Sequence, residues 1–509
     1  MTQPGLGRLS DIVARWAERT PAATALWEEG RATTYGELAA RCDAAGGLLE
    51  AYGVRRGDRV MIVGENCVAQ VVLFFAASTL CAWPVLVNAR LTERELESIG
   101  EHCEPRLRVF VGPEEGAAAA HARREGAVPQ RHPLLGLIAL RRSPGEIAVE
   151  PPELAERVAA LIYTSGTTGA PKGVMVTHEG LLGFAARSAA ARGLTPADIV
   201  FGALPLSHIF GVATILLTTL HAGASVWLVP RFDAAAACET LSRQDISALH
   251  GVPSLYARLI EHLARLPGRP TFPALRYLYA GGGALDPELK GRVEGMLGLP
   301  LHHGYGMTEY AGSMFVTHVD RPRSDHLPGE LAADCEVRFS DAAGRDVAPG
   351  TAGEIWIRGP GTMLGYYRAP ELTREVLTAG GWLRTGDLGF LEADGALRIV
   401  GRSRDLIKRS GFTVYPLEVE AELASHPAVH RTAVLGIPAA GADERVVAFV
   451  ELRAGAATTP AQLLEHARQR LAGYKVPQRI VIVPHLPLTE NGKVRKLELK
   501  ERWTDSAQV

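Results

Sequence analysis

Residues 163–173 read Tyr163-Thr-Ser-Gly-Thr-Thr-Gly-Ala-Pro-Lys-Gly173, a run of hydroxyls and glycines that follows the apolar segment Val158 to Ile162. Glycine lets the backbone approach a polyphosphate closely, hydroxyl and amide groups donate hydrogen bonds to its oxygens, and Lys172 adds a positive charge. The common nucleotide-triphosphate loop is excluded, because the segment lacks Gly-Lys-Ser/Thr at the required spacing. A flexible loop without a ligand is the alternative for a shorter match. We predict a phosphate-binding loop formed by Thr164, Ser165, Gly166, Thr167, Thr168, Gly169 and Lys172.

A second motif, residues 302–309, reads His302-His-Gly-Tyr-Gly-Met-Thr-Glu309. Tyr305 has the ring to stack on a purine, and Glu309 offers an oxygen ligand for a Mg²⁺ ion that bridges phosphates. A turn with a core tyrosine and a surface glutamate explains this motif better when it is taken alone.

Three more motifs combine glycine with charged side chains. Gly381-Trp-Leu-Arg-Thr-Gly-Asp387 presents a carboxylate that can accept hydrogen bonds from both ribose hydroxyls. In Gly401-Arg-Ser-Arg-Asp-Leu-Ile-Lys-Arg-Ser-Gly411, Arg402 can donate to a sugar or phosphate oxygen. Leu488-Thr-Glu-Asn-Gly-Lys493-Val-Arg-Lys496 places a lysine at an Asn-Gly turn. Taken singly, all three are ordinary charged turns on a protein surface.

The composition is that of a folded protein with no strong overall charge. An apolar fraction of 47% with 22% charged residues excludes a disordered or collagen-like chain. Lys and Arg number 54 against 56 Asp and Glu, so no global field favours nucleic acid or anionic membranes. Six cysteines without a CxxC pair fit neither a disulfide framework nor a zinc site. With no basic and apolar leader at the N-terminus, we expect a cytoplasmic protein in a reducing compartment.

Two uncharged stretches, Val68 to Val87 and Ile209 to Pro230, need weighing as membrane spans. Pro84 interrupts the first, which we interpret as a buried helix that runs into a buried strand. The second contains Ser225, three threonines and His221. We therefore expect no integral membrane segment.

The order of hydrophobic patterns predicts an α/β protein. Up to about residue 280, helical patterns alternate with short apolar runs, which implies a largely parallel sheet. From about Gly329 the segments become short and alternating, which predicts a small β-rich subdomain. After Gly401 we expect an α+β unit with helices Pro416 to Leu423 and Pro460 to Leu471, and strands Thr432 to Gly436, Arg445 to Leu452 and Arg479 to Val483.

Together and in this order, the five motifs resemble those of the adenylate-forming superfamily of acyl-CoA synthetases, firefly-type luciferases and peptide-synthetase adenylation domains. The resemblance covers roughly Ala22 to Lys500. It implies an N-terminal domain over residues 1–402, with the β-rich subdomain at about 329–402, and a mobile C-terminal domain over 403–509. The hinge falls at Arg404, where most relatives have Asp or Lys. The resemblance also implies ATP, Mg²⁺ and coenzyme A as ligands.

The resemblance assigns a role to each motif. Lys493 would bridge the attacking carboxylate and the α-phosphate, Glu309 and Thr168 would hold Mg²⁺, and His208 would act catalytically beside the carboxylate. The predicted ATP and AMP ligands are Thr164 to Gly169, Lys172, Gly281, Gly282, Gly283, His303, Gly304, Tyr305, Gly306, Thr308, Asp387, Arg402 and Lys493. The predicted acyl pocket comprises His208, Ile209, Phe210, Ala280, Gly281, Gly304, Gly306 and Tyr310. The predicted CoA site comprises Arg90, Ser410, Gly411, Tyr474 and Lys475.

Two side chains that this chain lacks narrow the class of acid substrate. Amino-acid activators carry an Asp in the segment corresponding to Ser207 to Gly223, and this chain has none there. Malonate activators place an Arg before the motif tyrosine, whereas Gly304 supplies room without charge. A neutral fatty or aromatic monocarboxylate is favoured, with His208 as a gate, although a buried core histidine is a competing interpretation.

The leading interpretation is an ATP-dependent acid:CoA ligase. Three alternatives stay open: an acyl-AMP ligase that loads a carrier-protein phosphopantetheine, an inactive nucleotide-binding regulator, and a luciferase-like oxidative second step. The oligomeric state is undecided, with a homodimer as one option.

Overall fold

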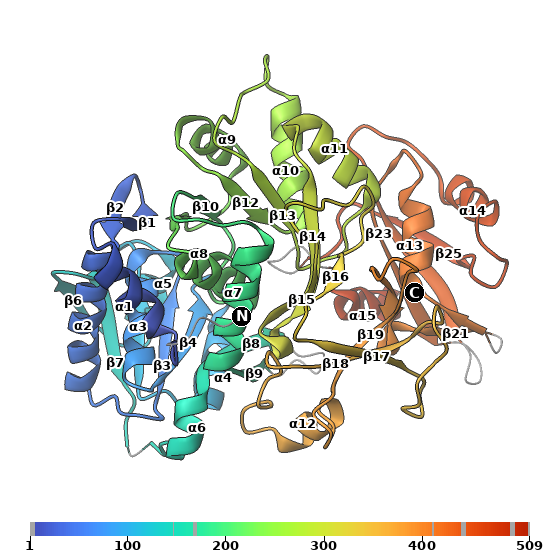
Figure 1. Cartoon of the computed structure of the whole chain (residues 1–509). Helices are drawn as coiled ribbons and strands as arrows, with labels where there is room; N and C mark the ends of the chain where they lie inside the picture. The colour runs from blue at the N-terminus through green and yellow to red at the C-terminus, as the bar shows by residue number, and fades with distance from the viewer. Residues whose placement is uncertain are drawn as a thin grey trace. The chain divides into compact units, whose positions relative to one another are not determined.

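The computed structural model describes residues 6–145, 147–165, 171–409, 412–438, 444–488 and 494–506. Its contacts divide the chain into two compact units. Figure 1 labels the helices and strands. Unit 1 comprises Met1–Glu336 and Arg358–Leu383, and unit 2 comprises Val337–Ile357 and Arg384–Val509. Most of the β-rich segment thus belongs to unit 2, together with the C-terminal residues. The sequence motifs instead place the whole segment in the N-terminal domain. The domain boundary at residue 402 and the hinge at Arg404 stay predictions.

The largest sheet of unit 1 has nine strands in the order β16-β15-β14-β13-β12-β10-β11-β1-β2. Its central strands, from β14 to β1, are parallel, and β15, β16 and β2 are antiparallel additions at the edges. This confirms the predicted parallel α/β layer. The strands are β1 (Thr24–Glu28), β2 (Arg31–Thr34), β10 (Ile199–Gly202), β11 (Ser225–Leu228), β12 (Ala248–Gly251), β13 (Tyr277–Ala280), β14 (Leu301–Met307), β15 (Gly312–Val316) and β16 (Glu330–Leu331).

A second sheet of unit 1 has five strands in the order β4-β3-β5-β7-β6, and a separate hairpin is formed by β8 and β9. The strands β3, β4 and β5 are parallel and deeply buried, as expected for strands that helices cover on both faces. These strands are β3 (Arg59–Gly64), β4 (Trp83–Asn88), β5 (Leu107–Val111), β6 (Val128–His132), β7 (Gly136–Arg142), β8 (Val158–Ser165) and β9 (Pro171–Thr177).

The helices of unit 1 begin at recognisable caps. Before α2, the Thr34 side chain accepts a bond from the Glu37 N–H while the Glu37 carboxylate accepts one from the Thr34 N–H, and Thr92 and Glu95 open α4 in the same way. These helices are α1 (Ser10–Arg19), α2 (Tyr35–Ala51), α3 (Val68–Thr79), α4 (Glu93–Cys103), α5 (Ala117–Arg124), α6 (Pro152–Arg157), α7 (His178–Ala191), α8 (Thr218–His221), α9 (Ala234–Arg243), α10 (Pro253–Ala264), α11 (Pro287–Leu297) and α12 (Pro370–Val376).

Both uncharged stretches belong to the core. The first forms the buried helix α3 and the buried strand β4, as predicted. The second forms a π-helical segment η1 (Phe210–Leu217), then α8 and β11, and every residue of η1 is buried. Within the described residues, no helix has the length and apolarity needed to cross a membrane.

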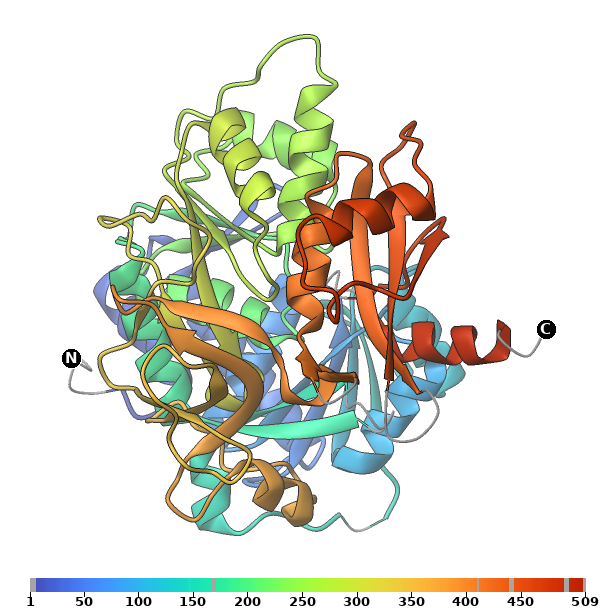
Figure 2. The same cartoon turned by 90° about the vertical axis from the view of Figure 1, so that its right-hand side faces the viewer.

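Unit 2 contains a four-stranded sheet, a short hairpin and a three-stranded sheet, whose strands lie side by side in orange and red in Figure 2. Leu463, Ala467 and Leu471 pack in one core with α13 and the last sheet. The helix predicted over Pro460 to Leu471 is present, but it ends at Arg468. The strands are β17 (Glu336–Ser340), β18 (Gly353–Arg358), β19 (Leu383–Leu391), β20 (Leu397–Arg402), β21 (Ile407–Arg409), β22 (Phe412–Val414), β23 (Val429–Pro438), β24 (Glu444–Leu452) and β25 (Arg479–Val483). The helices are α13 (Pro416–Ala424), α14 (Pro460–Arg468) and α15 (Lys496–Ser506).

Candidate active site

Three of the predicted site segments leave the same edge of the large sheet. The strands β10, β12, β13 and β14 are successive neighbours and run parallel, so their carboxyl ends meet at one edge. Residues 203–208 follow β10, residues 281–283 follow β13, and Glu309 lies just beyond β14. Ligands of parallel α/β sheets bind at this edge. The topology therefore brings together segments that lie about a hundred residues apart in the sequence.

The glycine segment at the end of β13 packs against Phe210. Gly282 has a φ of +73°, which an L side chain rarely adopts, and a Cβ placed on Gly281 would lie 3.1 Å from the Phe210 ring. The Phe210 ring meets Tyr279 edge-on at 5.9 Å, and Ile209 and Ala280 are buried beside these residues in the chain. Phe210 and the glycine segment, both predicted to line the acyl pocket, are thus in contact, and the pocket itself stays a prediction.

His303 is tied to the same glycine segment. Its Nδ1 lies 2.9 Å from the His326 carbonyl oxygen, and its Nε2 lies 3.3 Å from that of Gly283. Burial lowers the pKa of His303 to about 4, so the ring is neutral near pH 7. A neutral imidazole has one N–H, and the shorter contact indicates that Nδ1–H donates to His326.

His208 is half-buried at the start of η1, so it is not the fully buried core histidine of the competing interpretation. Its Nδ1 accepts a hydrogen bond of 3.1 Å from the Phe210 N–H. An accepting Nδ1 places the hydrogen of the neutral ring on Nε2. The gate role of His208 stays a prediction.

Glu309 is connected to the lysine of the phosphate loop through a tyrosine that the sequence motifs do not include. Glu309 lies in the short 3₁₀ helix η2 (Thr308–Tyr310), and the Tyr366 hydroxyl donates a 2.8 Å hydrogen bond to its Oε1. The Lys172 ammonium lies 5.3 Å from the centroid of the same ring, within cation–π range. One side chain thus contacts two predicted phosphate-site residues.

Backbone hydrogen bonds fix the position of Tyr366. The segment that carries it pairs with β9: the Met175 N–H donates to Gly365, the Leu364 N–H donates to Met175, and the Tyr367 N–H donates to Gly173. Because β9 also carries Lys172, one strand positions both side chains. The sequence signal for Tyr366 is weak, since a glycine followed by two tyrosines is common in turns.

Gly304 does not provide the room that the sequence suggested. A Cβ on Gly304 would lie 2.0 Å from the Tyr279 hydroxyl and 2.9 Å from the Phe315 carbonyl oxygen. The space is therefore filled by Tyr279, which also hydrogen-bonds to the Ser313 hydroxyl at 3.1 Å. Gly306 is required for a similar reason, because its Cβ would lie 2.3 Å from the Gly312 carbonyl oxygen.

Tyr310, which is predicted to line the acyl pocket, is packed in the core, and its pocket role stays a prediction. Tyr310 is 1% exposed, and its hydroxyl is 2.9 Å from the Cys335 sulfur. Cβ atoms on Gly359 or Gly361 would lie within 3 Å of its ring or hydroxyl. Its side chain is therefore committed to core packing. Thr308 is likewise buried. Tyr305 is also buried, at 9% exposure, and it packs on Phe315 at a centroid distance of 6.4 Å.

In unit 2, Asp387 and Arg402 face each other on neighbouring strands. They are paired in the register of β19 and β20, and the Arg402 Nε donates to Asp387 Oδ1 at 2.8 Å. Asp387 is buried and Arg402 is exposed. Arg404, the predicted hinge, lies in the turn η3 (Ser403–Asp405) directly after β20.

The predicted CoA ligands already have protein partners. In unit 1, the Arg90 Nε lies 3.2 Å from Glu65. In unit 2, the Lys475 ammonium is 2.5 Å from Glu418 and lies over the Tyr474 ring. Their binding roles stay predictions. Seven predicted residues lie outside the described part of the chain: Gly166, Thr167, Thr168, Gly169, Ser410, Gly411 and Lys493.

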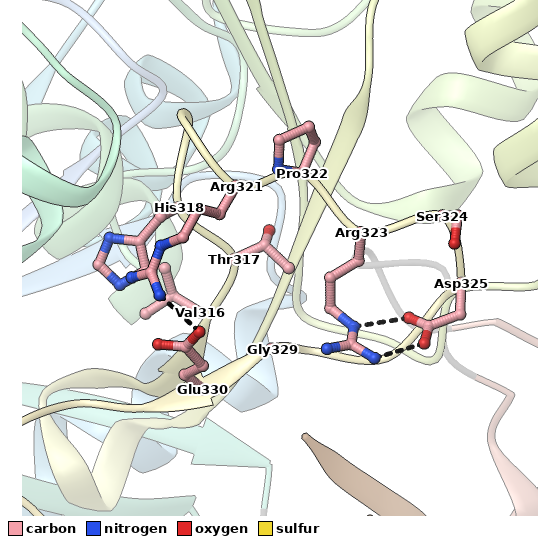
Figure 3. A pocket seen from close by; sticks show the side chains of 10 residues that line it. All are labelled: Val316, Thr317, His318, Arg321, Pro322, Arg323, Ser324, Asp325, Gly329 and Glu330. Atoms are coloured by element: carbon pink, nitrogen blue, oxygen red, sulfur yellow. Dashed lines mark hydrogen bonds and ion pairs between the residues drawn. The ribbon is translucent and has the colours of Figure 1, made fainter. Parts of the chain in front are cut away.

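A surface cavity of about 300 Å³ lies beyond β15 and contains none of the predicted residues (Figure 3). Its charged side chains are paired, because Arg321 contacts Glu330 at 2.9 Å and Arg323 contacts Asp325 at 2.5 Å. The paired charges leave this cavity without a clear ligand preference.

Comparisons with known proteins identify the family. Residues 13–367 match the model of the AMP-binding enzymes, and residues 418–493 match that of the AMP-binding enzyme C-terminal domain. A feruloyl-CoA synthase from Amycolatopsis sp is 34% identical over 99% of this chain and 100% of its own length. A sulfoacetate–CoA ligase from Cupriavidus necator is 33% identical over 93% of each chain.

A solved structure has the same fold over nearly the whole length. ATP-bound MatB from Rhodopseudomonas palustris superposes with a TM-score of 0.85 at 29% identity, covering 97% of this chain and 99% of that one. The chain therefore belongs to the family of AMP-binding enzymes, as an adenylate-forming acid–thiol ligase that works with ATP, Mg²⁺ and coenzyme A.

Proposed function

We propose that this enzyme activates a fatty or aromatic monocarboxylic acid with an uncharged tail. It first forms acyl-AMP and pyrophosphate, then acyl-CoA and AMP. The observation that carries the proposal is the meeting of the 281–283 glycines, Phe210 and Glu309 at one sheet edge. The 207–223 segment carries no charged residue, which favours an uncharged tail.

The first half-reaction brings two anions together, so it needs positive charge and alignment more than proton transfer. Lys493 supplies that charge at the attacking carboxylate and the α-phosphate. Lys172, whose ammonium lies over Tyr366, neutralises charge beside the 164–169 loop. The neutral His303 and the glycines of residues 281–283 border the nucleotide base.

Glu309 is the Mg²⁺ ligand in this scheme, together with Thr168. A carboxylate oxygen is the donor type that Mg²⁺ prefers, and Tyr366 holds this one in a fixed orientation. When bound, the ion stabilises negative charge on the departing pyrophosphate. Asp387 accepts hydrogen bonds from the ribose hydroxyls, and its bond to Arg402 keeps it oriented.

In the second half-reaction a thiol attacks the acyl-adenylate. The 410–411 segment lines the thiol channel, with a pivot at Arg404, and Gly411 permits close backbone approach. Arg90, Tyr474 and Lys475 bind the CoA nucleotide, with Arg90 and Lys475 exchanging their present carboxylate partners for phosphate.

The test is AMP release with ATP, Mg²⁺ and free CoA across fatty, benzoic, phenylacetic and dicarboxylic acids. We expect acid-dependent AMP with a matching acyl-CoA. Pyrophosphate release without acyl-CoA would point to a carrier-protein thiol. No release of AMP or pyrophosphate with any acid would contradict catalysis. Lys493→Ala should abolish acid-dependent exchange of pyrophosphate into ATP while the protein stays folded. Unchanged exchange in that variant would remove the role given to Lys493.

A further inference from the structure

A small cavity lies between α7 and β15, next to the predicted acyl pocket. Its volume is about 20 Å³, and its lining is formed by Phe184, Arg187, Ser188, Arg192, Ser313, Val316 and Ala332. Phe184, Ser188 and Arg192 are spaced by four residues, so they lie on one face of α7. Arg192 is the residue that caps the C-terminal end of this helix. A space of this size accommodates about one non-hydrogen group the size of a water molecule.

Arg192 brings an unusual charge to this cavity. The side chain is 1% exposed, and its guanidinium carbon lies 4.4 Å from the centroid of the Tyr279 ring. The Tyr277 side chain interacts with this guanidinium, but within the described residues its Nε and Nη1 have no hydrogen-bond partner. The same is true of the hydroxyl of Ser188, a residue that is 5% exposed. No carboxylate in that part of the chain pairs with Arg192. Buried donors without acceptors destabilise a fold, so a ligand that supplies an acceptor is favoured here.

Strand pairing connects the cavity to the acyl pocket. Ser313 pairs with Gly306 and Val316 pairs with Gly304 in the register of β14 and β15, and both glycines are predicted acyl-pocket residues. Tyr279 spans the two regions, because its hydroxyl lies against Gly304 and bonds to Ser313 while Arg192 covers its ring. The cavity thus adjoins the predicted acyl pocket at the end that Tyr279 closes.

We propose that the acid substrate carries a neutral acceptor oxygen at the end remote from its carboxylate, and that Arg192 and Ser188 bind it. The inference rests on the proposed function and narrows its substrate to acids with a terminal hydroxyl, ether or carbonyl oxygen. The Arg192 Nε and Nη1 donate to that oxygen, and Phe184, Val316 and Ala332 form the apolar part of the cavity wall around it. A volume of about 20 Å³ fits one such oxygen better than a second carboxylate.

The test compares acids of equal shape that differ only in a terminal methyl or hydroxyl group. Suitable pairs are 4-methylbenzoate with 4-hydroxybenzoate, 4-methylcinnamate with 4-hydroxycinnamate, and each fatty acid with the ω-hydroxy acid that is one carbon shorter. Terephthalate probes a second charge. The readout is kcat/KM for acid-dependent exchange of pyrophosphate into ATP, with thermal unfolding as the check on folding.

In the wild type we expect at least about a tenfold preference for the hydroxyl member of one pair. Arg192→Met should abolish or reverse that preference, and Ser188→Ala should weaken it severalfold while leaving the fold intact. The matched control is Arg258→Met, because Arg258 also stacks on a ring, that of Phe232, but is exposed on α10. It should leave the preference unchanged.

Equal rates for both members of every pair, or a preference that survives in Arg192→Met, would overturn the proposal. A higher kcat/KM for terephthalate than for 4-hydroxybenzoate would overturn the proposal that the bound oxygen belongs to a neutral group. Failure of the proposed function looks different, because then neither member of any pair would support exchange.

Discussion

The hydroxyl of Tyr366 donates a 2.8 Å hydrogen bond to Oε1 of Glu309, across a sequence separation of 57 residues. The same ring lies under the Lys172 ammonium. Tyr366 therefore couples the orientation of the proposed Mg²⁺ ligand to the strand that carries the phosphate-loop lysine. It does so as a positioning residue, since it touches neither reacting atom.

Tyr366→Phe should raise the Mg²⁺ concentration for half-maximal pyrophosphate exchange about tenfold, because a hydrogen bond to a charged group contributes about 1.5–3 kcal/mol. The aromatic ring and its contact with Lys172 are kept in this variant. A Mg²⁺ titration at saturating ATP and acid measures the effect. The control is Tyr367→Phe, which removes a 2.7 Å bond to Glu150, a carboxylate without a proposed ligand role. Equal Mg²⁺ requirements in the two variants would contradict the positioning role.

Asp387→Asn should raise KM for ATP about tenfold or more, because it removes the ionised acceptor for the ribose and the charge that Arg402 pairs with. Glu354→Gln is a matched control. Glu354 pairs with Arg384 at 3.2 Å in the same four-stranded sheet and has no proposed ligand. Steady-state kinetics with varied ATP separate the two. A similar KM for ATP in Asp387→Asn and wild type would mean that the pair is structural only.

Gly304→Ala should lower the free energy of unfolding by about 1–3 kcal/mol, because the new methyl group would overlap the Tyr279 hydroxyl. Gly291→Ala is the comparison. Gly291 lies within α11 with no atom near its Cβ position, so alanine there should stabilise by about 0.5–1 kcal/mol. Urea unfolding of both variants measures the difference. A neutral Gly304→Ala would show that Tyr279 moves away without cost.

Stability should fall steeply when the pH drops from about 6.5 towards 4. Burial lowers the pKa of His178, His302 and His303 to about 4, and it also lowers the pKa of His250 well below its usual range. Between these values and an unfolded pKa of about 6.5, the unfolded chain binds protons that the native protein excludes, so each histidine contributes a slope of about 1.4 kcal/mol per pH unit. Thermal unfolding from pH 7.5 to 4.5 tests this. His250→Gln should flatten the profile, and an unchanged profile would contradict the burial of a neutral ring.

The sequence predicts the elements well where a local signal fixes them. Ala234 to Arg243 shows a helical pattern, and α9 spans those residues because the Asp233 side chain caps its start. The glycine segment and the motif that ends at Glu309 are recognisable because backbone approach and metal binding require particular residue types.

Contacts made through tertiary pairing are not accessible in this way. Tyr366 reaches Glu309 only because its segment pairs with β9, far earlier in the chain. From the sequence, the Arg192 side chain at the end of a helix would be expected in solvent, because arginine is rarely buried. In the structure it is enclosed. The space at Gly304 is taken by a side chain from the neighbouring parallel strand, which no local pattern reveals.

The pairing of β9 with the Tyr366 segment also has a consequence for biosynthesis. Its hydrogen bonds join Met175 to Gly365, so they close a loop of roughly 190 residues. The ribosome releases the first part of unit 2 before it releases this segment, because unit 1 resumes at Arg358. Until then the β8–β9 hairpin of a nascent chain lacks these hydrogen bonds, although β4 and α7 already pack against it. The Lys172 ammonium gains its contact with the Tyr366 ring only after residue 366 has left the exit tunnel.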